Sequence, residues 1–395
     1  VKNLATGSST IAVTFNNQGG TVEGDAGTLA FAGGTNTGGT YVAALGATLL
    51  IAGYFGGSYS GSGAGTISLN SNLLITGDNA TFNFSRGLFQ VTGSGIDLDG
   101  HTLFNVGTIS FAANAILFGN SGIAANGSGN QGGTLDNQGT VLASAGNLVM
   151  YDSVHILNEG LWQFTGDASV GNGNYAPRFV NAASSTLSKI GGTATSAIGV
   201  PFDNQGGLVV ADTGTLDLGG GSNTGGTYRA GAGAVILLRG SYVGTFTGSG
   251  AGAVHLGENI LIGAAGATFN FDPGLFQWTG AGIDLNAHTL VNGGFMSWGT
   301  GTLFGNTAAG GNGSGNQGGT LDNRGTILAG GTTLFYDSVT LFNEGTFNLI
   351  GDASMALGNY SPTISNGATG TFEKTGGTGT SGVDVAFSNP GQVIA

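Results

Sequence analysis

The residues of this chain that could do chemistry are mostly carboxylic acids, and many of them occur twice at a nearly constant distance. Clustered Asp and Glu side chains can cleave a polysaccharide when one acts as an acid and another as a base or nucleophile. A catalytic centre needs one assembled group, whereas these acids recur once in each half of the chain. We therefore expect hydrogen bonding at turns or solvation, and we predict no catalytic residue. The recurring polar pairs are Asp97 and Asp284, His101 and His288, Tyr151-Asp152 and Tyr336-Asp337, Glu159 and Glu344, and Asp167 and Asp352.

Metal binding receives little support from the histidines. The chain has four His and no Cys, and no two histidines have the H-x-H or H-x₃-H spacing of a metal motif. His101 in DGHTLFN and His288 in NAHTLVN each lie between a turn and a predicted strand, which is typical of a turn histidine bonded to the backbone. The DLDG sequence at Asp97 is similar to the start of a calcium loop, but its second copy reads DLNA. We predict no metal and no cofactor, with calcium as an open alternative.

The basic and aromatic residues differ between the two halves of the chain. Five arginines have no basic counterpart in the other half, whereas Lys2, Lys189 and Lys374 recur. A lyase that depends on Lys or Arg chemistry is therefore poorly supported. The three tryptophans mostly match apolar or aromatic residues, which favours core packing over a sugar-stacking platform. The five arginines are Arg86, Arg178, Arg229, Arg239 and Arg324, and the tryptophans are Trp162, Trp278 and Trp298.

Composition excludes several classes of protein. Only 7% of the 395 residues are charged and 82 are glycine, while 40% are hydrophobic, which is enough to bury a core and argues against disorder. The net charge is −13 and no basic cluster occurs, so we predict no nucleic-acid partner. The longest apolar run, residues 41–55, is shorter than the roughly 20 residues that cross a bilayer. We expect no transmembrane segment.

An internal duplication organises the whole sequence. Residues 15–44 and 202–231 share 19 of 30 identical positions, and NGSGNQGGTLDN occurs identically at 126–137 and 312–323. A period of this kind is the signature of a repeat architecture. The predicted segments are the end of a preceding unit (1–14), repeat unit 1 (15–201), repeat unit 2 (202–386) and the start of a third unit (387–395). We expect one continuous solenoid that stops within a unit at each end.

A shorter period lies within each repeat unit. Asparagines that follow apolar residues recur with a step of about 22 residues, and one longer step contains the duplicated dodecapeptide. Segments such as TISL, TFNF, TVLAS and LWQF have the composition of short strands, about three in each period, and no segment has helical periodicity. This pattern predicts an all-β parallel β-helix, or β-solenoid, with about 22 residues per coil and eight coils in each of two tandem units of about 186 residues.

Asparagines at one corner of successive coils can form a ladder, because an amide side chain both donates and accepts hydrogen bonds. Glycine and asparagine also suit corners that require a positive φ. Charged residues are scarce since a charge in one coil would face its own copy in the next. The predicted corner ladder consists of Asn105, Asn137, Asn158, Asn181, Asn204, Asn292, Asn323, Asn343, Asn366 and Asn389.

The duplicated dodecapeptide predicts an enlarged corner loop in each unit. We propose that these loops, or the strands beside them, contact neighbouring rods or glycans. The predicted contact residues are Asn126, Ser128, Asn130, Gln131, Asn312, Ser314, Asn316 and Gln317.

The repeats resemble those of large bacterial exported surface proteins, of the autotransporter-passenger and filamentous-haemagglutinin-like kind. The motifs that carry the resemblance are GGTYRAGAGAVILLRG, GSGAGTI, GTLDNRGTILAGG, LFNEGTFNLIGDAS and TGTFEKTGGTGT, and it extends over essentially the whole chain. The resemblance implies a right-handed β-helix, export to the bacterial surface, and use as an adhesin or fibre. It offers no shared catalytic residues.

These observations predict a structural, extracellular protein that forms a stiff rod or fibre and is adhesive in some settings. The expected partners are copies of the chain that stack end to end, or the continuation of a longer chain, because solenoid ends expose unpaired strand edges. Glycans or the surface of a host or neighbouring cell are further expected partners. The alternatives are a β-helical polysaccharide lyase or hydrolase, and a passive glycan-binding module.

Overall fold

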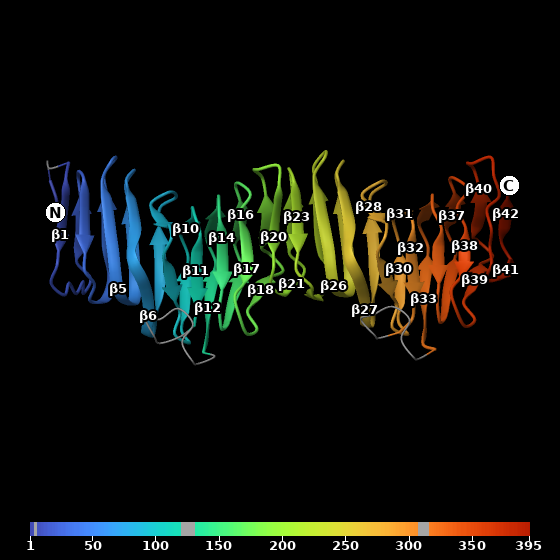
Figure 1. The fold of residues 1–395 in the computed structure, drawn as a ribbon, viewed down its shortest axis with the longest axis horizontal. Helices are drawn as coiled ribbons and strands as arrows, with labels where there is room; N and C mark the ends of the chain where they lie inside the picture. The colour runs from blue at the N-terminus through green and yellow to red at the C-terminus, as the bar shows by residue number, and fades with distance from the viewer. Residues whose placement is uncertain (4–5, 120–130, 307–315) are drawn as a thin grey trace. The chain divides into compact units, whose positions relative to one another are not determined.

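The chain folds as an all-β parallel solenoid. The structure is a computed structural model that describes residues 1–3, 6–119, 131–306 and 316–395. These residues form 42 strands and no helix, and the strands pair in parallel from one turn to the next (Figure 1). The chain completes about 17 turns of roughly 21 residues each, which confirms the predicted fold class. Within the described residues, no helix has the length and apolar character needed to cross a membrane.

The strands are short, apart from four long ones. Up to residue 202 they are β1 (Ser8–Ile11), β2 (Thr21–Gly24), β3 (Thr28–Phe31), β4 (Thr35–Ala43), β5 (Thr48–Ser62), β6 (Thr66–Phe84), β7 (Phe89–Val91), β8 (Gly95–Asp97), β9 (Thr102–Asn105), β10 (Thr108–Phe111), β11 (Ala115–Phe118), β12 (Gly132–Asn137), β13 (Thr140–Ala143), β14 (Asn147–Met150), β15 (Ser153–Asn158), β16 (Leu161–Phe164), β17 (Ser169–Asn172), β18 (Arg178–Asn181), β19 (Thr186–Lys189) and β20 (Thr195–Ile198). The others are β21 (Phe202–Asn204), β22 (Leu208–Ala211), β23 (Thr215–Leu218), β24 (Gly221–Asn223), β25 (Gly226–Ala230), β26 (Val235–Ser249), β27 (Ala253–Phe271), β28 (Phe276–Trp278), β29 (Gly282–Asp284), β30 (Thr289–Asn292), β31 (Phe295–Trp298), β32 (Gly301–Phe304), β33 (Gly318–Asn323), β34 (Thr326–Ala329), β35 (Thr333–Phe335), β36 (Ser338–Asn343), β37 (Thr346–Leu349), β38 (Met355–Leu357), β39 (Thr363–Asn366), β40 (Thr371–Lys374), β41 (Ala386–Ser388) and β42 (Gln392–Ile394).

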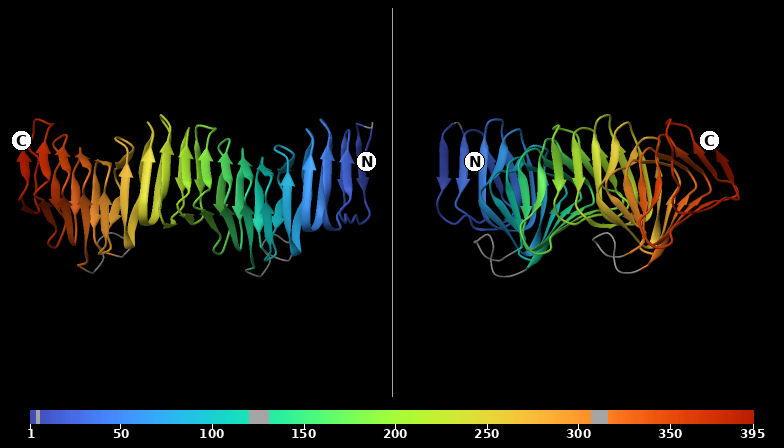
Figure 2. Two further views of the ribbon diagram at one scale, coloured as in Figure 1. Left: turned by 180° about the vertical axis from the view of Figure 1, so that it is seen from behind. Right: turned by 45° about the vertical axis from the view of Figure 1, so that its right-hand side comes forward.

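The structure divides into two compact units, Val1–Phe202 and Asp203–Ala395, which we call the first and second unit. Each unit contains one pair of long strands, β5 and β6 in the first and β26 and β27 in the second, with 15 and 19 residues in both pairs. Figure 2 shows from two further directions that strands of successive turns lie side by side within each unit. The duplication in sequence is thus a duplication of local structure.

Side chains alternate between the core and the surface along each strand. In the first unit Ile109, Val141, Trp162 and Leu187 occupy matching positions of successive turns and are fully buried. Their neighbours along the strands point outward because successive side chains of a strand point to opposite faces. Burying a side chain of this size stabilises the fold by about 1.5–3 kcal/mol. The core is therefore a continuous apolar stack inside the coil of each unit.

Aromatic rings widen the core where the long strands pair. In the first unit Phe82 lies with its ring centroid 5.2 Å from both Phe84 and Phe89, and 5.6 Å from Tyr59. The buried Tyr59 hydroxyl donates to the carbonyl of Gly56 at 2.8 Å, so its polar atom is satisfied. The corresponding cluster of the second unit consists of Tyr228, Tyr242, Phe246, Phe269, Phe271 and Phe276.

Glycine is required at one corner because the backbones of successive turns approach closely there. A Cβ atom on Gly139 would lie 2.2 Å from the carbonyl oxygen of Gly107, and one on Gly160 would lie 2.2 Å from that of Gly139. These distances are far inside van der Waals contact. The N-x-G sequence that recurs at this corner thus combines a buried amide with a residue that has no side chain.

A lysine points into the solenoid near the end of the first unit. The side chain of Lys189 is fully buried, and its Nζ donates to Asp167 Oδ1 at 2.8 Å, to the Gly191 carbonyl at 2.9 Å and to Ser196 Oγ at 3.1 Å. The hydrogen bond from Lys189 lowers the pKa of Asp167 below its ordinary 3.8. A buried ammonium group needs such a set of acceptors to offset the loss of its hydration. In the second unit Lys374 Nζ donates to Asp352 Oδ1, to the Gly379 carbonyl and to Ser381 Oγ, so the lysine, aspartate and serine recur while the carbonyl acceptor lies three residues further along the turn.

We predict that Lys189→Ala destabilises its surroundings more than Lys374→Ala does. Both substitutions remove an ion pair, but the Lys189 side chain is 0% exposed and that of Lys374 is 21% exposed. Solvent replaces the lost contacts more easily at the more exposed site. Amide hydrogen exchange of β19 and β40 in the two variants measures the difference. The prediction would be contradicted if β19 in Lys189→Ala and β40 in Lys374→Ala lost the same amount of protection from exchange.

Candidate functional site

The predicted corner asparagines form buried rows of amide hydrogen bonds. Asn105 Nδ2 donates to Asn137 Oδ1, and Asn137 Nδ2 donates to Asn158 Oδ1, both at 2.7 Å. The second hydrogen of the Asn137 amide is donated to the carbonyl of Leu161 at 3.0 Å. All three side chains are fully buried, and strand register places them directly above one another. Equivalent amide contacts join Asn158 to Asn181 (2.9 Å), Asn292 to Asn323 (2.7 Å), Asn323 to Asn343 (2.6 Å), Asn343 to Asn366 (2.7 Å) and Asn366 to Asn389 (2.7 Å).

Each row begins abruptly at its N-terminal end. The turn before Asn105 has Phe82 at the matching position, and the turn before Asn292 has Phe269. A phenyl ring cannot donate such a hydrogen bond, so the buried Oδ1 atoms of Asn105 and Asn292 have no hydrogen-bond partner within the described part of the chain. Every amide inside a row, in contrast, both accepts and donates along the stack.

Asn204 forms hydrogen bonds through its backbone as well as through its side chain. Its backbone N–H donates to Asn223 Oδ1 at 3.1 Å, and its Nδ2 donates to the carbonyl of Gly207 at 3.1 Å. The same arrangement occurs in the first unit, where the Asn17 N–H donates to Asn36 Oδ1 at 3.0 Å. Sequence reasoning missed Asn36 and Asn223 because these turns have 19 residues and not 22. The signal that could have found them is the N-T-G-G sequence shared by both halves.

We predict that Asn137→Ala lowers the free energy of unfolding by about 2–5 kcal/mol, because it leaves a buried donor of Asn105 and a buried acceptor of Asn158 without partners. Asn105→Ala should cost less, since it also removes an oxygen that is already unsatisfied. The control is Asn83→Ala on the exposed surface, with an expected effect within about 0.5 kcal/mol. Urea unfolding of the three variants ranks their losses of unfolding free energy. An Asn137→Ala variant as stable as the Asn83→Ala control would contradict the prediction.

The predicted contact loops lie mostly outside the described residues. This applies to Asn126, Ser128, Asn130, Asn312 and Ser314. The other three are Gln131, Asn316 and Gln317, and all of them are exposed. Asn316 Oδ1 accepts a hydrogen bond from Ser338 Oγ at 2.7 Å.

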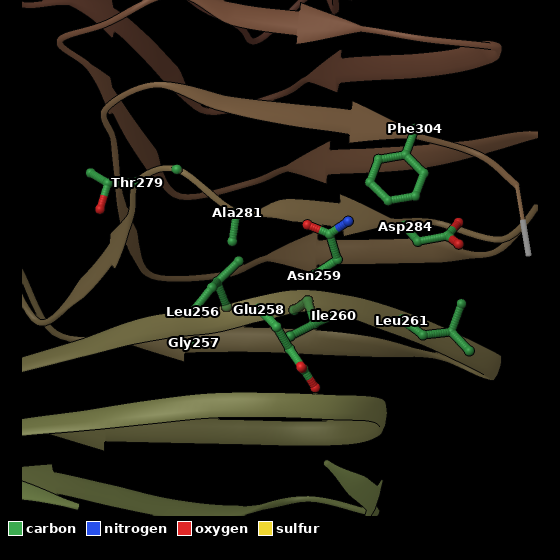
Figure 3. A pocket seen from close by; sticks show the side chains of 11 residues that line it. Leu256, Gly257, Glu258, Asn259, Ile260, Leu261, Thr279, Ala281, Asp284 and Phe304 are labelled. Atoms are coloured by element: carbon green, nitrogen blue, oxygen red, sulfur yellow. The ribbon is translucent and has the colours of Figure 1, made fainter. Parts of the chain in front are cut away.

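A lateral pocket occurs at matching positions of the two units and contains a recurring acid. In the second unit it has a volume of about 620 Å³, and its lining includes Asn259, Asp284 and Phe304 (Figure 3). Asn259 Oδ1 accepts the Gly282 N–H at 2.6 Å, and the Phe304 ring lies so close to Gly282 that a Cβ there would be 2.4 Å from it. In the first unit the matching residues are Asn72, Gly95, Asp97 and Phe118, with a hydrogen bond of 2.8 Å from Gly95 N to Asn72 Oδ1.

The acid in each pocket is nearly buried. Burial raises the pKa of Asp97 and of Asp284 to about 7, although each carboxylate accepts a backbone N–H two residues later in the chain. Negative charges contribute to the raised pKa as well, from Asp99 and Asp152 at Asp97 and from Asp337 at Asp284. A carboxyl group that titrates near neutral pH in a pocket is a candidate for proton transfer or for hydrogen bonding to a ligand.

A second recurring acid is held by the backbone close to the pocket. Asp152 and Asp337 are fully buried in a left-handed conformation with φ 61°. Their Oδ2 atoms accept the N–H groups of Gly119 and Gly305, both at 3.0 Å, while their Oδ1 atoms have no hydrogen-bond partner among the residues that the structure describes. These acids therefore order the backbone of the turn beside them.

The tryptophans and the recurring histidines lie in the core or at turns. Trp162, Trp278 and Trp298 are at most 2% exposed and lie in the core. The His101 backbone accepts a hydrogen bond from the Thr134 N–H at 2.9 Å, and the backbone of His288 does the same from Thr320. Across the described ranges, no three His, Cys, Asp or Glu residues gather as a metal site.

Comparison with known proteins adds no assignment. No family model, no curated protein and no solved structure matches the chain. The resemblance to exported surface proteins thus stays a prediction from sequence motifs, and the geometry of the rows and pockets carries the functional argument.

We predict that the protein loses stability as pH rises from about 4 to about 7, in part because of Asp97 and Asp284. An acid whose pKa is about 7 when folded and 3.8 in a reference peptide binds more protons in the folded state over this interval, so raising the pH favours unfolding. The Asp97→Asn/Asp284→Asn double variant should show a shallower decline. Unfolding midpoints in urea between pH 4 and pH 8 test this, and parallel curves for both proteins would contradict it.

Proposed function

We propose that the chain is a structural segment of an extracellular protein at a bacterial surface, in which stacked β-coils form a stiff rod or fibre. The observation that carries this proposal is the buried asparagine row, which links successive turns from Asn105 to Asn181 in the first unit and from Asn292 to Asn389 in the second. Such a row restrains each turn against sliding or tilting relative to the next, because any shift would break buried hydrogen bonds at several levels.

Further features support a structural role. Duplicated sequence adds length while it preserves the core and the corner contacts, as expected of a spacer whose extent matters more than a single reactive centre. The low content of charged residues keeps stacked turns free of repulsion between copies. Export and adhesion are proposed from the repeat motifs alone, and end-to-end association or continuation in a longer chain stays a prediction of the same kind.

A glycan-cleaving enzyme is the second candidate. The observation that favours it is the position of Asp97 and Asp284 in pockets, since burial raises the pKa of each to about 7, a value suited to a general acid. Both acids recur with nearly the same surroundings, which a structural role explains equally well.

Electron microscopy of the purified protein, together with surface labelling of the source cells, tests the structural proposal. We expect unbranched rods or filaments of constant width, and antibodies that label intact cells without permeabilisation. Compact round particles or labelling confined to permeabilised cells would overturn it. Release of reducing ends or unsaturated products from neutral or acidic polysaccharides, abolished in an Asp97→Asn/Asp284→Asn variant, would favour the enzyme.

A further inference from the structure

The two units differ at the outer edge of the lateral pocket. The shared part contains Asn72 and Asp97 in the first unit and Asn259 and Asp284 in the second. In the first unit, however, the hollow continues over earlier turns and reaches a volume of about 1170 Å³, compared with about 620 Å³ in the second. We call this longer hollow the first-unit groove.

An ion pair lies across the equivalent strip of the second unit. Arg239 forms a two-point contact with Asp217, at 2.8 and 3.1 Å, and a third contact with Glu258 at 3.4 Å. The carboxylate of Glu258 lies over Gly220, where an added Cβ would be 3.1 Å from its Oε1. The charged side chains thus cover the glycine strip.

The first unit lacks all three charged side chains at these positions. Ala30, Ala52 and Ser71 occupy the places of Asp217, Arg239 and Glu258 in the duplicated sequence. As a result Gly33, Gly34 and Gly53 remain part of the groove lining. The backbones of Gly34 and Gly53 are so close that a Cβ on Gly53 would lie 2.4 Å from the Gly34 carbonyl, so the floor of the groove has to stay without side chains.

One aromatic ring stands beside this floor. Tyr54 lines the groove and is 42% exposed, whereas its counterpart in the second unit is Ser241. Its backbone is fixed by a hydrogen bond from its N–H to the Gly34 carbonyl at 2.8 Å and by register with Thr35 and Leu74 in the adjacent turns. An exposed ring on a rigid strand offers an apolar face to a ligand at a small entropy cost.

The rest of the lining determines which ligand chemistry fits. Among the described residues that line the groove, the charged ones are Asp97 and Asp99 and none is a cation, so an anionic ligand is disfavoured. A peptide strand cannot add here, because β5 already pairs with β4 on one side and β6 on the other. Hydroxyl and amide groups remain as polar partners, from Thr35, Asn72 and Ser94 among others.

We infer that the first-unit groove binds an uncharged oligosaccharide, with one sugar ring stacked on Tyr54 and sugar hydroxyls bonded to Asn72 and to the Asp97 carboxyl group. A sugar has an apolar C–H face for the ring and hydroxyl groups that both donate to and accept from these polar side chains. The second unit does not bind the same ligand, because the ion pair of Arg239 covers its strip and Ser241 offers no ring. The inference goes beyond the structural proposal and does not depend on it.

Isothermal titration of the full chain with neutral hexasaccharides tests the groove. The probes are the β-1,4-linked and β-1,3-linked glucose hexamers and the β-1,4-linked N-acetylglucosamine hexamer, with an oligogalacturonate as the anionic comparison. We expect at least one neutral probe to bind with one site per chain. Tyr54→Ser, which introduces the residue of the second unit, should weaken binding about tenfold or more.

Two further variants make the test specific. Ala30→Asp/Ala52→Arg/Ser71→Glu transfers the ion pair of the second unit and should abolish binding by covering the strip. Tyr175→Asn is the matched control, because Tyr175 is 57% exposed outside the groove and its φ of 51° suits asparagine. It should bind like the unaltered protein, and the melting temperature of each variant shows whether it is folded.

The inference is overturned by any of four results. These are no binding of any neutral probe, binding of the anionic probe alone, two equal sites per chain, or binding that Tyr54→Ser leaves unchanged. Tyr54→Ser replaces a surface residue, so it tests whether the groove binds the oligosaccharide even if the triple variant fails to fold. None of these results bears on rod formation or surface exposure, which electron microscopy and cell labelling test separately.

Discussion

The whole structure depends on turns that stack in register, so that each residue faces its counterpart in the next turn. A buried polar side chain in such a column must find its hydrogen bonds among copies of itself and the backbone. Asparagine meets this condition because its amide has an acceptor on one atom and two donors on the other. Asn137 uses all three, one toward each neighbouring amide and one toward the Leu161 carbonyl. A carboxylate could not continue the row, since two of them would repel and neither would donate.

The same stacking rule explains how the few charged and many small residues are used. Lys189 is tolerated inside because it occurs once at that level and has four acceptors around it. Glycine is needed wherever the backbones of successive turns approach closely, as at Gly139 and Gly160. These local requirements come from the contact between turns and not from the function of either unit.

Duplication kept the inward-facing positions apolar or amide-bearing and changed the charge of several outward-facing ones. The asparagine rows, the aromatic cluster and the lysine with its aspartate recur in both units. On the outer surface, Asp217, Arg239 and Glu258 stand where the first unit has Ala30, Ala52 and Ser71. The inner residues pack against side chains of the neighbouring turns, whereas an outer residue has fewer packing contacts that restrict its type. Two copies of one scaffold can therefore present different surfaces.

The sequence by itself determined the repeat, the strand content and the corner asparagines, because these depend on local periodicity and on a spacing that can be counted. It also identified Asp97 and Asp284 as recurring acids, but not their burial. Only the tertiary structure decided that turns of 19 residues bring Asn17 to Asn36, and that Tyr54, Asn72 and Asp97 meet in one groove. Those residues come from three successive turns of unequal length. Their alignment depends on how bulges in β5 and β6 absorb the differences, which no constant period reveals.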